Sequence, residues 1–255
     1  MTLTLNLQAG QKVYFASDFH LGTPDKGTSL QREKKIVKWL DMASQDAEAI
    51  FLLGDIFDFW FEYKRAVPKG FVRFQGKLAE LADQGKKIYI FTGNHDMWMF
   101  DYFPSEFGIP VYSDPLNLEI NQQKLLVGHG DGLGPGDNQY KKLKKIFKNS
   151  LSQKAFSMLH PNLGVGLAHK WSRKSRLANS EIEEVFHGDN EYLLIYCKEQ
   201  EAINHHDYYI FGHRHLRLDL EVSKNSRYLN PGDWVNHSNY IVFDGTTCKL
   251  VEFKD

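Results

Sequence analysis

Five apolar stretches of the chain each end in side chains that could bind metal ions. The first, Lys12–Ser17, runs into Asp18 and His20. Four further stretches deliver the other candidates: Asp55, Asn94, His129, His213 and His215. Oxygen and nitrogen ligands without a thiolate suit Mn²⁺, Fe²⁺ or Zn²⁺ at a catalytic site better than a structural zinc. Two ions held roughly 3.5–4 Å apart can bind both oxygens of an in-line phosphoryl displacement. The pattern therefore predicts a two-metal site with Asp55 between the ions.

The spacing of these residues adds to the prediction. Asp18 and His20 are two residues apart, and in extended backbone both side chains leave the same side of the chain. His213 and His215 repeat this spacing, and the carboxylate of Asp55 can bridge two ions. An isolated Asp-x-His is more often a turn or a helix cap, but five such fragments in series favour the metal site. The remaining histidines lack this context and are interpreted as surface or internally satisfied residues: His160, His169, His187, His205, His206 and His237.

The elements that must position these side chains follow from the apolar pattern. Ile50–Leu53 is an apolar run stopped by Gly54, typical of a strand buried on both faces. Ligands bind just beyond the carboxyl ends of strands in open α/β sheets. Helices are expected over Leu30–Ser44, Phe71–Gln84 and Glu191–Ile203. Late strands are expected in a second sheet, over Tyr208–Phe211, Leu218–Val222, Arg227–Asn230, Tyr240–Phe243 and Lys249–Glu252. Early βα units followed by β-rich sequence predict two stacked sheets with helices outside.

Composition limits the class of protein. The 255 residues suit one large domain or a domain with a sizeable insertion, and 42% apolar residues suffice for an ordinary core. Cys197 and Cys248 form no CxxC pair, which favours a reducing compartment over a disulfide framework. The first ten residues lack a signal-peptide pattern, and no window approaches the roughly 18 apolar residues of a membrane span. We therefore expect a soluble, cytoplasmic protein that could rest on a membrane surface.

The net charge of −1 conceals a strongly basic segment. From Asn138 to Arg176 there is no Asp or Glu, while Lys and Arg recur throughout. Such asymmetry indicates an anionic partner, which could be a phosphorylated substrate, lipid headgroups or nucleic acid. Tyr140, Leu143, Phe147 and Leu151 would share one face of the first helix in this segment. The alternative is a solvated basic face over an ordinary apolar stripe.

The five blocks together resemble those of calcineurin-like metallophosphoesterases. The resemblance covers residues 12–215 and implies an α/β fold of four layers, in which two packed mixed sheets are flanked by helices. It also implies that Asp18, His20, Asp55 and His215 surround one ion, whereas Asp55, Asn94, His129 and His213 surround the other. His95 would lie beside the reacting phosphate and protonate the leaving oxygen or stabilise developing charge, with Asp96 as its orienting partner. The alternative for His95 is a packed loop residue.

Within that superfamily the chain is most similar to the UDP-2,3-diacylglucosamine diphosphatases of bacterial lipid A synthesis. The likeness rests on the aromatic stretch Gly54–Trp60 and on Asp137 and Tyr140, which follow His129 at the family's spacing. It implies one metallophosphoesterase domain over residues 1–255, with residues 133–190 forming a helical lid over the acyl chains. The substrate-binding residues it implies are Asn94, His95, Asp137, Tyr140, Ser175, Arg176, Asn179 and His213. The best-known members carry arginine where this chain has His95, and only histidine can act as an acid at neutral pH.

The sequence therefore predicts hydrolysis of UDP-2,3-diacylglucosamine to UMP and 2,3-diacylglucosamine 1-phosphate, with water activated by two divalent ions, most suitably Mn²⁺. We expect peripheral contact with the inner face of an anionic inner membrane and no nucleic-acid partner. The first alternative is a related two-metal enzyme that acts on a soluble nucleotide or another phosphodiester. A non-catalytic scaffold and a nucleic-acid-binding protein are further alternatives from other classes.

Overall fold

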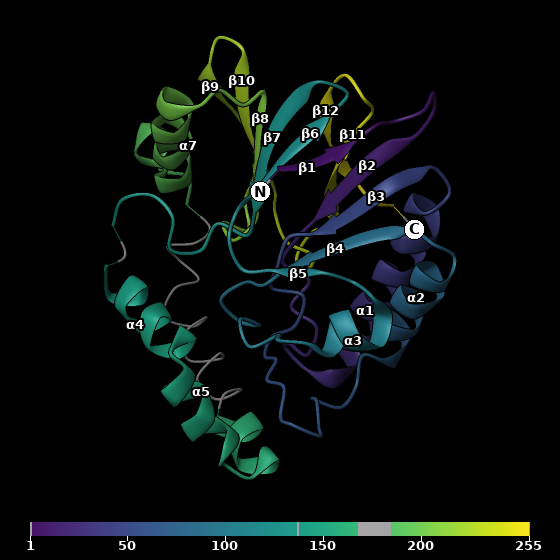
Figure 1. Cartoon of the computed structure of the whole chain (residues 1–255), viewed down its shortest axis with the longest axis vertical. Helices are drawn as coiled ribbons and strands as arrows, with labels where there is room; N and C mark the ends of the chain where they lie inside the picture. Colours follow the sequence, from purple (N-terminus) through teal and green to yellow (C-terminus); the bar gives the residue numbers. More distant parts are fainter. Residues whose placement is uncertain (1, 137, 168–184, 255) are drawn as a thin grey trace.

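The computed structural model describes residues 2–136, 138–167 and 185–254. They form an α/β fold around two six-stranded sheets (Figure 1). The first sheet has the order β12-β11-β2-β3-β4-β5. Its strands are β2 (Lys12–Ala16), β3 (Ala47–Leu52), β4 (Lys87–Phe91), β5 (Val111–Tyr112), β11 (Asn239–Phe243) and β12 (Cys248–Glu252). Strands β2 to β5 are parallel, so the chemistry-bearing loops after β2, β3 and β4 all leave the same edge.

The second sheet has the order β1-β6-β7-β8-β10-β9. Its strands are β1 (Thr2–Leu5), β6 (Leu116–Ile120), β7 (Gln123–Gly128), β8 (Tyr208–Phe211), β9 (Arg217–Ser223) and β10 (Ser226–Pro231). β7 and β8 are parallel neighbours, which brings the loops after them together. Each sheet also contains antiparallel neighbours, β11 with β2 in the first and β6 with β7 in the second. Both sheets are therefore mixed, as predicted.

The expected division of strands between the sheets is wrong in part. The last two strands, β11 and β12, belong to the first sheet, because β11 pairs antiparallel with β2 through Ile241 and Phe15. β1 joins the second sheet by parallel pairing with β6. Local alternation of apolar residues specifies that a segment is a strand, but it does not specify which strand it pairs with.

Helices cover the outer faces of both sheets. α1 (Lys26–Ala43), α2 (Val72–Asp83) and α3 (Tyr102–Phe107) lie on the first sheet, whereas α7 (Tyr192–Ile203) packs against β9 and β10 of the second (Figure 1). α1 begins four residues before the predicted Leu30, because the carboxylate of Asp25 accepts hydrogen bonds from the backbone N–H groups of Gly27 and Thr28. The predicted four layers are confirmed.

Three apolar clusters hold the layers together. Phe15, Phe51 and Ile210 pack between the sheets and are fully buried. Trp39 and Trp60 fill the space under α1, α2 and α3, while Leu193, Cys197 and Tyr209 join α7 to the second sheet. Burying one such side chain contributes roughly 1.5–3 kcal/mol. Because the clusters reach the ends of the strands, they fix the starting points of the loops that form the site.

The basic segment is helical where the structure describes it. α4 (Asn138–Lys148) and α5 (Ser150–Ser157) are followed by a helical stretch at residues 161–167, and a short 3₁₀ helix, η1 (Gly188–Asn190), precedes α7. α4 and α5 extend away from the sheets in Figure 1. Trp98 of the main body donates a 2.9 Å hydrogen bond to the carbonyl of Phe147. None of the described helices has the length and apolar character that a membrane span requires.

Candidate metal centre and active site

Four of the predicted ligands meet at one point beyond the strands. The Nε2 atoms of His20 and His215 are 3.1 Å apart. Oδ1 of Asp18 lies 3.3 Å from Nε2 of His215, and Oδ2 of Asp55 lies 3.8 Å from Nε2 of His20. Each residue therefore offers one ligand atom to a common centre. The loops after β2, β3 and β8 supply these side chains.

The second group shares Asp55 with the first. Nε2 of His129 lies 3.4 Å from Oδ2 of Asp55 and 3.2 Å from Oδ1 of Asn94. The ring of His213 packs against that of His129 with centroids 5.1 Å apart, and Asp55, His129 and His213 form a potential ligand group. Nδ1 of His129 donates to the carbonyl of Leu53 at 2.8 Å, which leaves its Nε2 to face the other ligands. All seven predicted ligands thus belong to two adjacent groups.

The charges and unmet hydrogen bonds of these groups fit divalent cations. Among the described residues, Oδ1 of Asp18 is buried without a hydrogen-bond partner. Burial raises the pKa of Asp18, but the imidazoles of His215 and His129 outweigh this and lower it to about 2. Burial lowers the pKa of His213 to about 4. Burial lowers the pKa of His129, but the carboxylate of Asp55 outweighs this and raises it to about 10. Metal ligation requires ionised carboxylates and neutral imidazoles, so a cation bound here would take the place of the proton on His129. The Nε2 atoms of His20 and His215 lie close enough together for both to face one cation.

The backbone of the ligand loops differs from the extended form predicted for Asp18 and His20. Their φ angles are 57° and 42°, and Asp55, His213 and His215 are also left-handed, with φ of 50°, 69° and 53°. Asp, Asn and His adopt this region more readily than most residues, and such strain concentrates at functional sites. The side chains of Asp18 and His20, and those of His213 and His215, are therefore brought together by tight left-handed turns. The prediction that extended backbone brings them together is wrong.

Glycines allow the ligand loops to touch. A Cβ on Gly93 would lie 2.6 Å from the backbone nitrogen of Asp55 and 2.7 Å from its Cγ. A Cβ on Gly212 would overlap Oγ of Ser17 and lie 2.7 Å from Oδ2 of Asp18. Since real Cβ atoms do not approach other atoms so closely, each glycine is required by a close backbone approach.

Asp96 holds two of these loops together. Its Oδ1 accepts a 2.7 Å hydrogen bond from the backbone of Gly93, while its Oδ2 accepts from Ile56 at 2.7 Å and from Phe57 at 3.2 Å. The side chain is fully buried. These contacts give Asp96 a structural role between the loops after β3 and β4, rather than the predicted role of orienting His95.

His95 is oriented instead by Asp58. Its Nδ1 lies 3.1 Å from the carbonyl oxygen of Asp58 and 3.8 Å from the carboxylate Oδ1 of the same residue. A carbonyl can only accept, so Nδ1 carries a hydrogen, and a transferable proton would be on Nε2. The ring also contacts His20 edge-on, with centroids 4.9 Å apart. Sequence reasoning missed Asp58, although an acidic residue in the aromatic stretch Gly54–Trp60 was a signal.

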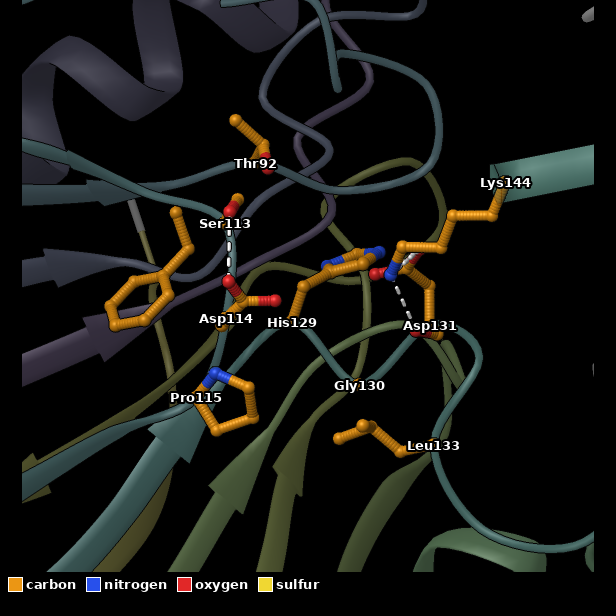
Figure 2. A pocket seen from close by; sticks show the side chains of 10 residues that line it. Thr92, Ser113, Asp114, Pro115, His129, Gly130, Asp131, Leu133 and Lys144 are labelled. Carbon is orange, nitrogen blue, oxygen red and sulfur yellow. Dashed lines mark hydrogen bonds and ion pairs between the residues drawn. The ribbon is translucent and has the colours of Figure 1, made fainter. Parts of the chain in front are cut away.

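A small polar pocket adjoins His129, one of the candidate ligands (Figure 2). It has a volume of about 30 Å³, room for about two water molecules. Figure 2 shows Lys144 reaching from α4 to Asp131, with Nζ 2.6 Å from its Oδ2. Tyr140, a predicted substrate residue, donates its hydroxyl to the same carboxylate oxygen. Asp131 therefore ties α4 to the loop that carries His129, a role that no local pattern in the sequence indicates.

The structure describes only some of the predicted substrate-binding residues. Asn94, His95 and His213 lie at the centre, and Tyr140 lies beside it on Asp131. Asp137, Ser175, Arg176 and Asn179 lie outside the described residues.

Aromatic contacts attach the basic helices to the main body. The centroid of the Phe156 ring lies 4.7 Å from the ring centroids of Phe61 and of Trp98. The alternative of a wholly solvated basic face does not hold for α4, because Lys144 binds Asp131 and Lys141 donates to the carbonyl of Gly134. The inner face of α4 is therefore used to seat the helix beside the metal centre.

Comparisons with known proteins agree with these observations. Residues 11–217 match the model of the family described as calcineurin-like phosphoesterase. A UDP-2,3-diacylglucosamine hydrolase of Porphyromonas gingivalis (strain ATCC BAA-308 / W83) is 36% identical over 96% of this chain and 98% of its own length. A hydrolase of the same name from Ectopseudomonas mendocina (strain ymp) is 28% identical over 91% and 94%, respectively.

Among solved structures, an archaeal phosphodiesterase covers 95% of this chain and 100% of its own, with a TM-score of 0.48 and 12% identity. This likeness is too loose to add to the assignment. The family model spans well over half of the residues, and all five sequence blocks meet at one centre. The chain therefore belongs to the calcineurin-like phosphoesterase family, as its sequence predicts.

Proposed function

We propose that this chain hydrolyses the diphosphate of UDP-2,3-diacylglucosamine, giving UMP and 2,3-diacylglucosamine 1-phosphate. The observation that carries the proposal is the convergence of seven oxygen and nitrogen ligands into two groups that share Asp55. The named relative from Porphyromonas gingivalis aligns over nearly the whole of both chains, which supports the choice of substrate.

In this proposal, Asp18, His20, Asp55 and His215 hold one divalent ion, while Asp55, Asn94, His129 and His213 hold the other. Such ions lower the pKa of water and neutralise charge on phosphate oxygens. Mn²⁺ is our first choice for a mixed oxygen and imidazole set, with Fe²⁺ or Zn²⁺ as alternatives. The complete ligand set argues against a scaffold that has lost its metals.

His95 would deliver a proton to the leaving oxygen. The Asp58 carbonyl holds Nδ1 and so fixes the plane of the ring, leaving Nε2 as the atom from which the proton departs. The carboxylate of Asp58 lies beside the same ring, with its Oδ1 3.8 Å from Nδ1. Asp96 contributes indirectly, because it keeps the backbone of both loops in place.

Residues 133–190 would act as a lid that contacts both substrate and membrane. Apolar side chains on its described helices are more than half exposed, including Ile146, Leu151, Met158 and Leu163. Lysines share these helices, and basic amphipathic helices bind anionic bilayers. We propose a peripheral site of action on the inner membrane. Lys145→Glu should weaken pelleting with anionic vesicles, whereas Lys224→Glu in the β9–β10 turn should not. Equal pelleting of both would contradict this role.

The substrate is tested with detergent-solubilised UDP-2,3-diacylglucosamine, incubated with Mn²⁺ or with EDTA. Release of UMP and the acylated sugar phosphate, measured by mass spectrometry, is expected only with Mn²⁺. Bis(p-nitrophenyl) phosphate is assayed in parallel. If the small diester turns over while no UMP forms, the lipid substrate is wrong and a soluble phosphodiester becomes the better assignment.

A further inference from the structure

Arg214 lies between two proposed metal ligands but does not face the metal centre. It is 2% exposed, and its guanidinium bonds to Glu191, with Nε 2.5 Å from Oε1 and Nη2 3.2 Å from Oε2. Glu191 is itself fully buried. Nη2 also donates to the carbonyl of Val185 at 2.8 Å. A buried guanidinium that binds a carboxylate and a backbone carbonyl in this way is held in a single position.

These partners mark the place where the helical segment, residues 133–190, returns to the main body. Glu191 is the N-cap residue of α7, and Val185 is the first described residue after position 167. The guanidinium carbon of Arg214 lies 5.3 Å from the centre of the Tyr192 ring, which also packs against the ring of His213 at 6.4 Å. Arg214 thus joins this return point to the loop that carries His213 and His215.

The outgoing end of the same segment lies at this point too. A Cβ on Gly134 would overlap the carbonyl oxygen of Tyr192 and lie 3.0 Å from its carbon. Lys141 of α4 donates to the carbonyl of Gly134. Both connections of the helical segment to the main body therefore contact the residues that Arg214 holds.

We infer that Arg214 is a positioning residue that couples the seating of the helical segment to the placement of the His213 and His215 imidazoles. The loop between them needs such support, because both histidines have left-handed backbone and this strain persists only where surrounding contacts over-determine it. A lysine would keep the charge but lose the paired hydrogen bonds. This inference rests on the metal site proposed above.

The first test is Arg214→Lys, with Arg227→Lys as its matched control. Arg227 also pairs with a carboxylate, Asp219 at 2.6 Å, but on the exposed surface of β10. Mn²⁺ affinity is measured calorimetrically, and the visible spectrum of the Co²⁺-loaded protein reports ligand geometry. Arg214→Lys should weaken Mn²⁺ binding about 10- to 100-fold and alter the Co²⁺ spectrum, whereas Arg227→Lys should change neither. A lower melting temperature with unchanged affinity and spectrum would reduce Arg214 to a structural residue and overturn the inference.

The second test perturbs the helical segment without touching a ligand. Gly134→Ala places a methyl group against Tyr192, while Gly136→Ala has similar left-handed backbone, with φ of 82° against 70°, and nothing within 4 Å. Coupling requires that Gly134→Ala alter the Co²⁺ spectrum and that Gly136→Ala leave it unchanged. Identical spectra for the two variants would refute the coupling. Failure of the wild-type protein to bind Mn²⁺ would instead refute the metal site itself, so the two failures are distinguishable.

Discussion

Replacing Gly93 by alanine tests how tightly the loops after β3 and β4 fit together. The added Cβ would lie 2.6 Å from the backbone nitrogen of Asp55 and 2.7 Å from its Cγ. Real Cβ contacts do not fall below 3.0 Å, so Asp55 must move by several tenths of an ångström. The obstacle includes main-chain atoms, which cannot rotate aside as the end of a flexible side chain could.

The expected cost follows from this crowding. Overpacking costs about 1–3 kcal/mol, which in a domain of this size lowers the melting temperature by roughly 2–12 °C. Displacing a metal-bridging carboxylate should cost far more in function, because a 1 Å misplacement can reduce the rate about 100-fold. We therefore expect Gly93→Ala to fold, to bind less Mn²⁺ and to lose at least about 100-fold in kcat/KM.

Gly76→Ala provides the matched control. Gly76 lies inside α2, and a Cβ there would meet nothing within 4 Å. Alanine is favoured over glycine in a helix by about 1 kcal/mol, so this variant should melt higher and keep full activity. Both variants are compared by scanning calorimetry, metal analysis and hydrolysis of bis(p-nitrophenyl) phosphate. Wild-type activity and metal content in folded Gly93→Ala would refute the close fit of the two loops.

Three further changes probe the chemistry, the helical segment and the fold. His95→Gln should lower kcat about 100- to 10,000-fold and leave the metal content unchanged. His237→Gln on the surface should change neither kcat nor the metal content. Loss of metal in His95→Gln would contradict the assignment. Phe156→Ala removes ring contacts with Phe59, Phe61 and Trp98, each worth about 0.5–1.5 kcal/mol. KM for the lipid substrate should therefore rise at least about 10-fold while hydrolysis of a small diester is retained; equal losses on both would argue against a lid. Burial raises the pKa of Glu201, but hydrogen bonds led by that from His205 outweigh it and lower the pKa from 4.5 to about 2. Its stabilising effect is therefore complete above pH 4.5 and lost as the pH falls toward 2. In urea unfolding with EDTA present, Glu201→Gln should be less stable than wild type by roughly 2–3 kcal/mol at pH 7, and a gap that does not shrink below pH 4.5 would contradict this linkage.

The residues of the candidate metal centre could be picked out from the sequence because each has a local signal. A strand that ends in Asp, Asn or His is visible in a few consecutive residues, and parallel strands bring such ends to one edge. Asp55 after β3 and His129 after β7 follow this rule. The helices were predictable for a similar reason, since apolar periodicity and capping residues lie within each segment.

The supporting contacts were not predictable from local sequence. Asp96 was expected beside His95, but it accepts backbone hydrogen bonds from a loop 39 residues away, and Asp58 takes its expected place. Arg214 and Glu191 are separated by 23 residues, and their contact depends on how α7 is placed on the second sheet. Such pairs depend on the assembled layers, so no pattern within either segment indicates them.

The same limit applies to the strand order and the turns. β11 and β2 pair through Ile241 and Phe15 although they lie near opposite ends of the chain, so neither segment alone indicates its partner. The left-handed φ of Asp18 and His20 comes from the crossing of the loops after β2 and β3, where the backbone of Asp18 donates to Gly54 and that of His20 donates to Asp55. The assumption that Asp18 and His20 lie in extended backbone could not anticipate these hydrogen bonds between the loops.

The metal content of wild type and of Asp55→Ala tests the central claim most directly. Each protein is loaded with Mn²⁺, desalted and analysed by plasma mass spectrometry, with Asp114→Ala as a control, since that carboxylate is 84% exposed. We predict about two ions per chain in wild type and in Asp114→Ala, and close to none in folded Asp55→Ala. A wild-type protein that retains no Mn²⁺, or an Asp55→Ala variant that retains both ions, would contradict a shared two-metal centre.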